Sequence, residues 1–288
     1  MSRIAYVNGR YVPHAEAVVH IEDRGYQFAD GVYEVIAVAG GRLIDEIGHL
    51  ERLDRSLREL RISPPMAYRS LALVIRETLR RNRVRDGIVY LQITRGVSRR
   101  DHPFPDGVRP ALVLTAKSVN FAAVAARAEK GVRVITVEDI RWARRDIKSI
   151  SLLPNVLAKQ DAREAGAYEA FQVDGEGLVT EGSSTNAWII DTDGRLVTRD
   201  LGTAILPGIT RQSVIDIARQ NGYTIVERAF TVEELKSARE VFLTSTTSFV
   251  MPVVQVDDKV IGNGQPGSLS TALLAAYRDY MDEVGHAA

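Results

Sequence analysis

Cysteine is absent from the 288 residues, which excludes disulfides, thiolate metal sites and cysteine nucleophiles together. Net charge is absent too, because 37 Lys and Arg residues balance 37 Asp and Glu residues. No overall field therefore attracts nucleic acid or an anionic membrane. No apolar run approaches the roughly 20 residues of a membrane-spanning helix, and the N-terminus begins with a strand pattern rather than a signal peptide. We expect a cytoplasmic protein in which any anion binding is local.

The hydrophobic pattern predicts helices and strands without strict β–α–β alternation, which favours an α+β fold. Asn8-Gly9 between two short β runs predicts a hairpin over 4–12. Apolar residues at steps of three and four predict helices over 46–61 and 68–82. Further strands are expected at 34–39, 42–45, 87–95, 111–117, 132–137, 169–173, 188–191 and 196–198, and further helices at 157–165, 211–221, 231–237 and 269–283.

Two domains are predicted on either side of a weakly patterned stretch. The alanine-rich residues 119–130 are interpreted as the linker between them. We therefore expect a smaller N-terminal domain over 1–118 and a larger C-terminal domain over 131–288.

Lysine is scarce, and this narrows the search for an amine nucleophile, because arginine stays protonated at any useful pH. Lys148 stands in the run Asp146-Ile-Lys-Ser-Ile-Ser-Leu-Leu-Pro154. Apolar neighbours disfavour the ammonium form, as a Schiff-base lysine requires. A lysine that points outward from an alternating strand is the alternative, and the local pattern alone favours it. The remaining lysines are Lys117, Lys130, Lys159, Lys236 and Lys259.

Three polar segments suit a cofactor with a ring and a phosphate. In Glu181-Gly-Ser-Ser-Thr-Asn186 the carboxylate could keep a pyridine nitrogen protonated. A polar turn between strands explains this segment equally well. Leu206-Pro-Gly-Ile-Thr-Arg211 places backbone N–H groups at a predicted helix start, where anions bind favourably. Thr244-Ser-Thr-Thr-Ser248 offers five consecutive hydroxyl residues. Ordinary capping and turn chemistry is the alternative for both.

Arg100 and His102 lie two residues apart in a proline-containing loop and could both reach one carboxylate. A solvated basic loop is the alternative, and it is favoured without other information. The other histidines show no metal-ligand spacing, so we expect no metal. The absence of GxSxG and GxGxxG argues against a serine hydrolase and a dinucleotide-binding unit.

In their order along the chain, these motifs resemble the fold-type IV family of pyridoxal-phosphate enzymes. The family includes the D-amino acid and branched-chain aminotransferases and aminodeoxychorismate lyase, and the resemblance covers nearly the whole chain. The motifs are Asp23-Arg-Gly25, Asp30-Gly-Val-Tyr-Glu34, His49-Leu-Glu-Arg-Leu53, the Lys148 segment, Glu181–Asn186, Leu206–Arg211 and Thr244–Thr247.

The resemblance implies that Lys148 binds pyridoxal 5'-phosphate and moves a proton during catalysis, and that Glu181 pairs with the pyridine nitrogen. The implied cofactor contacts also include Arg52, Ser183, Ser184, Ile209, Thr210, Ser245 and Thr246. Of these, Arg52, Ile209, Thr210 and Thr246 are the implied phosphate contacts.

Tyr33, Arg100 and His102 match the D-amino acid aminotransferase pattern, in which an Arg-x-His loop from the partner subunit and a tyrosine hold the α-carboxylate. Thr247 is a further implied substrate contact. The resemblance therefore implies a homodimer that transfers amino groups between D-amino acids and 2-oxo acids at a site between domains and at the subunit interface. Phe249 and Met251 depart from the polar residues of many relatives, so they bear on the shape of the pocket.

Three alternatives stay open on the sequence. A branched-chain L-aminotransferase would prefer leucine and depend little on Arg100 or His102. Aminodeoxychorismate lyase would use the same lysine without an acceptor oxo acid. A non-catalytic binding module would have to explain why the lysine, the glutamate and the phosphate contacts are all retained.

Overall fold

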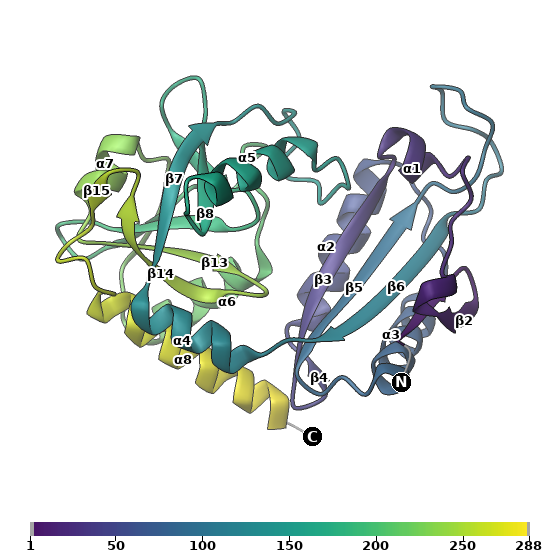
Figure 1. Cartoon of the computed structure of the whole chain (residues 1–288), viewed down its shortest axis with the longest axis horizontal. Coiled ribbons are helices and arrows are strands. Elements are labelled where there is room, and N and C mark those ends of the chain that lie inside the picture. The colour runs from purple at the N-terminus through teal and green to yellow at the C-terminus, as the bar shows by residue number, and fades with distance from the viewer. Residues whose placement is uncertain (1–2, 287–288) are drawn as a thin grey trace. The chain divides into compact units, whose positions relative to one another are not determined.

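The computed structural model describes residues 3–286 and divides the chain into two compact units (Figure 1). The first unit holds the residues up to Asn120 together with Ile147–Ser151. The second holds Phe121–Asp146 and Leu152–Glu283. Lys148 thus belongs to the first unit and not, as predicted, to the C-terminal domain, because its segment is hydrogen-bonded to a strand of the first unit.

The predicted linker over 119–130 is wrong for most of its length, because Phe121–Lys130 forms helix α4. Alanine has the highest intrinsic helix propensity, and the segment is rich in it. Ala128 is buried, and the Phe121 ring lies 5.1 Å from the Phe249 ring. Apolar anchors therefore hold this helix to the second unit.

An antiparallel sheet of six strands forms the first unit, in the order β2-β1-β6-β5-β3-β4. Asn8 and Gly9 turn the first hairpin with φ of 46° and 94°, the left-handed conformation that a tight hairpin needs. The strands are β1 (Ile4–Val7), β2 (Arg10–Pro13), β3 (Gly31–Ala39), β4 (Arg42–Leu43), β5 (Gly87–Thr94) and β6 (Ala111–Ser118).

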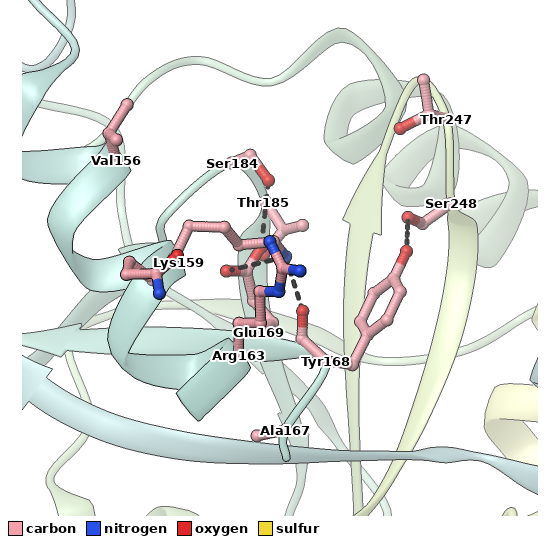
Figure 2. Close-up of a pocket in the computed structure, with 11 residues that line it drawn as sticks. Val156, Lys159, Arg163, Ala167, Tyr168, Glu169, Ser184, Thr185, Thr247 and Ser248 are labelled. Atoms are coloured by element: carbon pink, nitrogen blue, oxygen red, sulfur yellow. Dashed lines mark hydrogen bonds and ion pairs between the residues drawn. The ribbon is translucent and has the colours of Figure 1, made fainter. Parts of the chain in front are cut away.

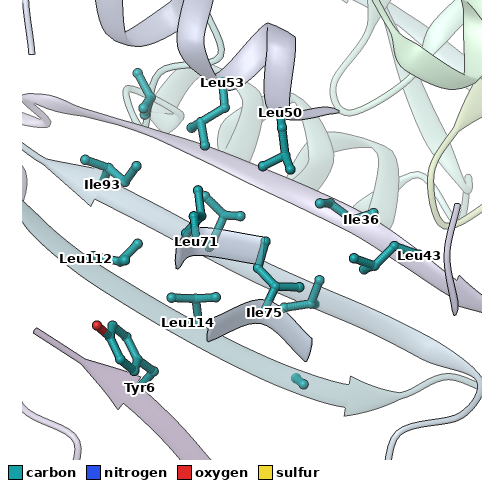
Figure 3. Packing of buried hydrophobic residues seen from close by; sticks show 14 of the residues in the cluster. Tyr6, Ile36, Leu43, Leu50, Leu53, Leu71, Ile75, Ile93, Leu112 and Leu114 are labelled. Carbon is teal, nitrogen blue, oxygen red and sulfur yellow. The ribbon is translucent and has the colours of Figure 1, made fainter. Parts of the chain in front are cut away.

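Two helices, α2 (Glu46–Glu59) and α3 (Tyr68–Asn82), supply the apolar residues that pack on the first sheet (Figure 3). Leu50, Leu53, Leu71 and Ile75 meet strand residues such as Ile36 in one buried cluster. The first unit also contains the short helices η1 (His14–Glu16) and α1 (Arg24–Phe28).

A mixed sheet of nine strands forms the second unit, in the order β12-β11-β10-β13-β14-β7-β8-β9, with β15 paired to β14. Its strands are β7 (Val132–Glu138), β8 (Glu169–Val173), β9 (Val179–Gly182), β10 (Asn186–Ile190), β11 (Leu196–Thr198), β12 (Ile225–Glu227), β13 (Glu240–Ser245), β14 (Phe249–Val256) and β15 (Lys259–Val260). Its other helices are α5 (Leu153–Glu164), α6 (Ile209–Gln220), α7 (Val232–Ser237) and α8 (Ser268–His286).

Both units mix helices with largely antiparallel strands, which confirms the predicted α+β class. The helix predicted at 157–165 begins earlier, at Leu153, because Pro154 occupies the first turn, where its fixed φ and missing N–H fit. Phe249 and Met251 are core residues of the second unit, and the Phe249 ring also contacts Tyr277 at 5.8 Å. Within residues 3–286, no helix has both the length and the apolarity that crossing a bilayer requires.

Candidate active site

The predicted site residues divide between the two units. The first unit carries Tyr33, Arg52, Arg100, His102 and Lys148. The second carries Glu181, Ser183, Ser184, Ile209, Thr210, Ser245, Thr246 and Thr247. We describe each set within its own unit.

Lys148 is held against the edge of β3 by backbone hydrogen bonds on both sides. Tyr33 N–H donates to the Lys148 carbonyl at 3.1 Å, and Ile150 N–H donates to the Gly31 carbonyl at 3.1 Å. Ser149 bridges to Val32 in antiparallel register. The predicted strand at this position is thus a short bridged segment, and its backbone cannot shift without breaking the β3 pairing.

The Lys148 side chain lies over the ring of Tyr33, with Nζ 4.3 Å from the ring centre. Tyr33 in turn contacts Tyr90 at 5.8 Å, and Tyr90 donates to the Gln92 amide oxygen at 2.6 Å. Burial, followed by the neighbouring Tyr33 phenol, raises the pKa of Tyr90 to about 12. Two residues predicted for the site, Lys148 and Tyr33, are therefore brought together beside a phenol that stays protonated.

Arg52 forms a bidentate ion pair with the fully buried Glu34. Nε and Nη2 of Arg52 lie 2.8 Å from the two carboxylate oxygens, and Nδ1 of His49 lies 2.8 Å from Oε2. Burial alone would raise the pKa of Glu34, but the Arg52 guanidinium and then His49 lower it to about 2. Burial lowers the pKa of His49, so its ring is neutral at pH 7 and donates from Nδ1. This cluster fixes Arg52, whose phosphate contact stays a prediction.

Arg100 and His102 lie on the long loop between β5 and β6. Both contact one aromatic ring, since the Arg100 guanidinium lies 4.6 Å and the His102 ring 5.6 Å from the centre of Phe28. The structure thus gathers these two residues at Phe28, at the end of α1.

Glu181 is the second-last residue of β9, and both of its carboxylate oxygens accept hydrogen bonds. Oε1 accepts from Arg141, and Oε2 accepts from Asn186 Nδ2 at 3.0 Å and from Leu206 N–H at 3.1 Å. Burial would lower the pKa of Arg141, but the carboxylates of Asp139 and Glu181 raise it. An ionised, oriented carboxylate of this kind suits a protonated pyridine nitrogen.

The start of α6 has the features of a phosphate site. Helix geometry leaves the N–H groups of Ile209 and Thr210 without an intrahelical acceptor, and within residues 3–286 no side chain caps this end. A Cβ at the N-cap residue Gly208 would lie 1.9 Å from Asn186 Oδ1, so the position tolerates only glycine without displacement. Since Asn186 also binds Glu181, the unit links the predicted partner of the ring nitrogen to the predicted phosphate site at the helix start, and both fit pyridoxal phosphate.

A polar cavity of about 610 Å³ opens in the second unit and includes Ser184 and Thr247 (Figure 2). Its floor is the fully buried Glu169, which accepts hydrogen bonds from Ser183 and, at 3.0 Å, from Ser184. Lys159 Nζ lies 3.4 Å from Glu169 Oε1. Arg163, one turn further along α5, has no ion pair within residues 3–286. The cavity therefore carries an excess of positive charge.

Of the predicted residues, Ser245 ends β13, and Thr246 and Thr247 belong to the turn that joins β13 to β14. Ser245 Oγ accepts from Ser248 N–H at 3.1 Å, which tightens the turn. Ser248 in turn exchanges a hydrogen bond of 2.6 Å with the Tyr168 hydroxyl. Of this group, Thr247, Ser248 and Tyr168 line the same cavity.

Sequence reasoning missed the residues that hold the predicted ones in place. Asp139 and Arg141 fix Glu181, and Glu34 and His49 fix Arg52. Glu34 and His49 appeared in the sequence only as members of the quoted motifs, and Asp139 and Arg141 only as charged residues that follow a strand. Their partners lie up to 40 positions away and meet only in the fold.

Comparison with known proteins places this geometry in a family. The family model described as amino-transferase class IV matches residues 31–256. The chain belongs to this family. It is 42% identical to the D-alanine aminotransferase of Bacillus licheniformis, over 94% of this chain and 95% of that protein. It is 41% identical to the D-alanine aminotransferase of Staphylococcus haemolyticus, over 96% and 97%.

Solved structures agree on the fold. The branched-chain aminotransferase of Thermoproteus uzoniensis, solved with norvaline, has a TM-score of 0.87 at 26% identity and covers 100% of this chain and 96% of that one. The branched-chain enzyme of Escherichia coli has a TM-score of 0.91 at 24% identity, over 98% and 95%, which shows the fold alone. Class IV aminotransferases depend on pyridoxal phosphate, so membership of this family confirms the predicted cofactor.

The Glu34 cluster predicts an acid-sensitive contribution to stability. The pKa of Glu34 is about 2 in the folded chain against 4.5 for the free side chain, so ionisation favours folding above pH 4.5 and less as the pH falls toward 2. Glu34→Gln should lower the free energy of unfolding at pH 7 by about 3–5 kcal/mol, because Arg52 stays buried without its carboxylate. The difference from wild type should shrink between pH 4.5 and 2 in urea unfolding.

Glu77→Gln is the matched control. Arg80 and Arg81 likewise lower the pKa of Glu77 to about 2, but this group lies at the surface of α3, where water screens the pair. Its replacement should change stability little at any pH. Equal losses in the two variants would contradict the role of the buried cluster.

Proposed function

We propose that this chain transfers amino groups between D-amino acids and 2-oxo acids. The observation that carries the proposal is the identity of 40–42% to D-alanine aminotransferases over nearly the full length. Tyr33, Arg100 and His102, which match the D-amino acid pattern, support it further. The branched-chain structures resemble this chain in fold but at lower identity.

Residues of the second unit suit the two ends of the cofactor. Pyridoxal phosphate, when bound, supplies an electron-withdrawing ring that stabilises negative charge at the Cα atom of the amino acid. Glu181, fixed by Arg141 and Asn186, holds a proton at the pyridine nitrogen. The N–H groups of Ile209 and Thr210 bind the phosphate at the α6 N-terminus, and the hydroxyl of Thr246 adds a donor.

Lys148 is the proposed covalent attachment point and proton carrier. Its backbone is fixed by the β3 pairing, and its amine lies over the face of the Tyr33 ring. A fixed attachment point that carries an amine suits a residue that takes the proton from Cα and later returns one. Arg100 and His102, as donors, hold the α-carboxylate of the substrate.

The decisive experiment is an absorbance titration of cofactor-loaded protein with D-alanine, D-glutamate and L-leucine in separate samples. We expect D-amino acids to convert the bound cofactor to its pyridoxamine form, and L-leucine to leave it unchanged. Lys148→Ala should abolish conversion, whereas Lys117→Ala, at an exposed site on β6, should not. Conversion by L-leucine alone would instead identify a branched-chain enzyme, and conversion by none would favour the lyase.

The cavity of Figure 2 supports a dicarboxylic acceptor such as 2-oxoglutarate. Lys159 is partly neutralised by Glu169, so Arg163 supplies the charge that a second carboxylate would meet. Ser184 and Thr247, both predicted site residues, line the same space. The distal carboxylate of the acceptor would therefore bind at α5.

Arg163→Ala should raise the KM for 2-oxoglutarate about tenfold, equivalent to 1.4 kcal/mol, and leave the KM for pyruvate unchanged, because pyruvate has no second carboxylate. Steady-state kinetics give the KM of each acceptor, with D-alanine as the donor for 2-oxoglutarate and D-glutamate as the donor for pyruvate. Asp161→Ala, also on α5 but outside the cavity, is the control. A change shared by both acceptors would contradict this subsite.

We further propose a homodimer in which the partner subunit provides Arg100 and His102. Large apolar side chains near the loop are exposed in the single chain, with Val18 at 76%, Ile21 at 75% and Tyr26 at 75% exposed. Burying one such side chain contributes about 1.5–3 kcal/mol. A second copy of the chain would cover them.

Subunit complementation tests this arrangement. In a mixed dimer of Arg100→Ala and Lys148→Ala subunits, one of the two sites receives an intact lysine and an intact arginine. Random pairing should thus restore about a quarter of wild-type activity at subsaturating D-alanine, above the sum of the two homodimers. Activity that stays at that sum would place Arg100 and Lys148 of one subunit in the same site.

A further inference from the structure

We propose that Arg24 is a positioning residue. It fixes the Arg100–His102 loop and thereby orients the two side chains that bind the substrate carboxylate. This inference rests on the proposed function, which assigns the carboxylate to Arg100 and His102. It concerns a buried network of Arg24, Asp30 and Arg95, which we call the Arg24 clasp. All of its contacts lie within the first unit.

The Arg24 guanidinium binds the backbone of the loop at Asp101 and His102, next to and at the residues proposed to bind the substrate. Nη1 donates to the Asp101 carbonyl at 2.6 Å, and Nη2 donates to the His102 carbonyl at 3.3 Å. Arg24 is only 3% exposed, so the guanidinium that makes these bonds is buried, although the loop residues that accept them are exposed. The backbone between Arg100 and His102 is therefore held by one side chain.

Asp30 fixes the orientation of the Arg24 guanidinium. Arg24 Nε donates to Asp30 Oδ2 at 2.8 Å, while Arg95 donates to both carboxylate oxygens at 2.7 and 3.0 Å. Arg95 also donates to the carbonyls of Leu60 and Arg61 at 2.7 and 2.9 Å, which anchor the clasp to the end of α2. One carboxylate thus joins two buried guanidinium groups to the body of the unit.

Two phenylalanine rings pack against the guanidinium groups of the clasp and the loop. Phe28, on the same short helix as Arg24, lies 4.8 Å from the Arg24 guanidinium and 4.6 Å from that of Arg100. Phe104, at the far side of the loop, lies 3.7 Å from the Arg95 guanidinium. Cation–π contacts of this kind orient planar guanidinium groups.

The base of the loop is closed separately from its tip. Gly96 has φ of 103°, and a Cβ there would lie 2.0 Å from the Arg109 carbonyl, so the two ends of the loop touch. The clasp acts instead at residues 101 and 102. A loop of this length would otherwise sample many conformations, and ordering it upon binding would weaken affinity.

The experiment compares Arg24→Met and Arg24→Lys with Arg80→Ala, a control on the exposed face of α3. Methionine keeps the length of the side chain but no donor. Lysine keeps the charge beside Asp30 but loses the planar fork that reaches three acceptors. Two readouts are needed, namely hydrogen exchange of the peptide over 97–106 in the cofactor-loaded enzyme and the kinetics with D-alanine.

We expect both Arg24 variants to speed amide exchange in 97–106 and to raise the KM for D-alanine about tenfold with kcat nearly unchanged. In a thermodynamic cycle with the Arg100→Ala/His102→Ala variant, Arg24→Met should add almost nothing, because it acts through those two residues. Arg24→Lys keeps the test valid if Arg24→Met does not fold.

Unchanged exchange in 97–106, or an effect of Arg24→Met that multiplies with that of the Arg100→Ala/His102→Ala variant, would overturn the proposal. The failure of the proposed function gives a different result. In that case Arg100→Ala alone would leave the KM for D-alanine unchanged, although faster exchange in the Arg24 variants would still be observed. That combination would retain the clasp as a loop anchor and remove its role toward substrate.

Discussion

The placement of Lys148 depends on a few backbone hydrogen bonds between its segment and the free edge of β3. The segment arrives from the second unit in sequence but pairs with the first, beside Tyr33. Gly31 permits this approach, because a Cβ there would lie 3.0 Å from the Ile150 side chain and 2.7 Å from the Ile93 carbonyl. The amine that we propose as the cofactor attachment point is thereby carried by a segment paired to a sheet, which fixes the position of its backbone.

In each unit, a buried carboxylate is held by an arginine and a second polar side chain. Glu34 is held by Arg52 and His49, and Glu181 by Arg141 and Asn186. Buried ion pairs add little net stability, because desolvation offsets their attraction. Their value here is geometric, since every oxygen has a defined donor and the carboxylates cannot rotate. The clasp at Asp30 extends the same principle to the loop between β5 and β6.

Local patterns predicted much of the fold, and long-range contacts account for what they missed. The Asn8-Gly9 hairpin and the stripes of α2 and α3 were recognisable because each is specified by neighbours within a few residues. Strand β14 was missed, since a strand buried on both faces shows no alternation. For the site, the pattern pointed to Lys148 and Glu181 only as candidates. The resemblance supplied their roles, whereas the pairing of Arg52 with Glu34 and of Arg141 with Glu181 became visible only in three dimensions.

Gly208 shows how closely two parts of the second unit are tied. The space its missing side chain leaves is filled by the Asn186 amide, which also binds Glu181. A larger residue at 208 would displace that amide, and the disturbance would reach the carboxylate as well as the α6 N-terminus. In the proposed cofactor site, a substitution at the phosphate end would therefore also disturb the nitrogen end, because Asn186 contacts both Gly208 and Glu181.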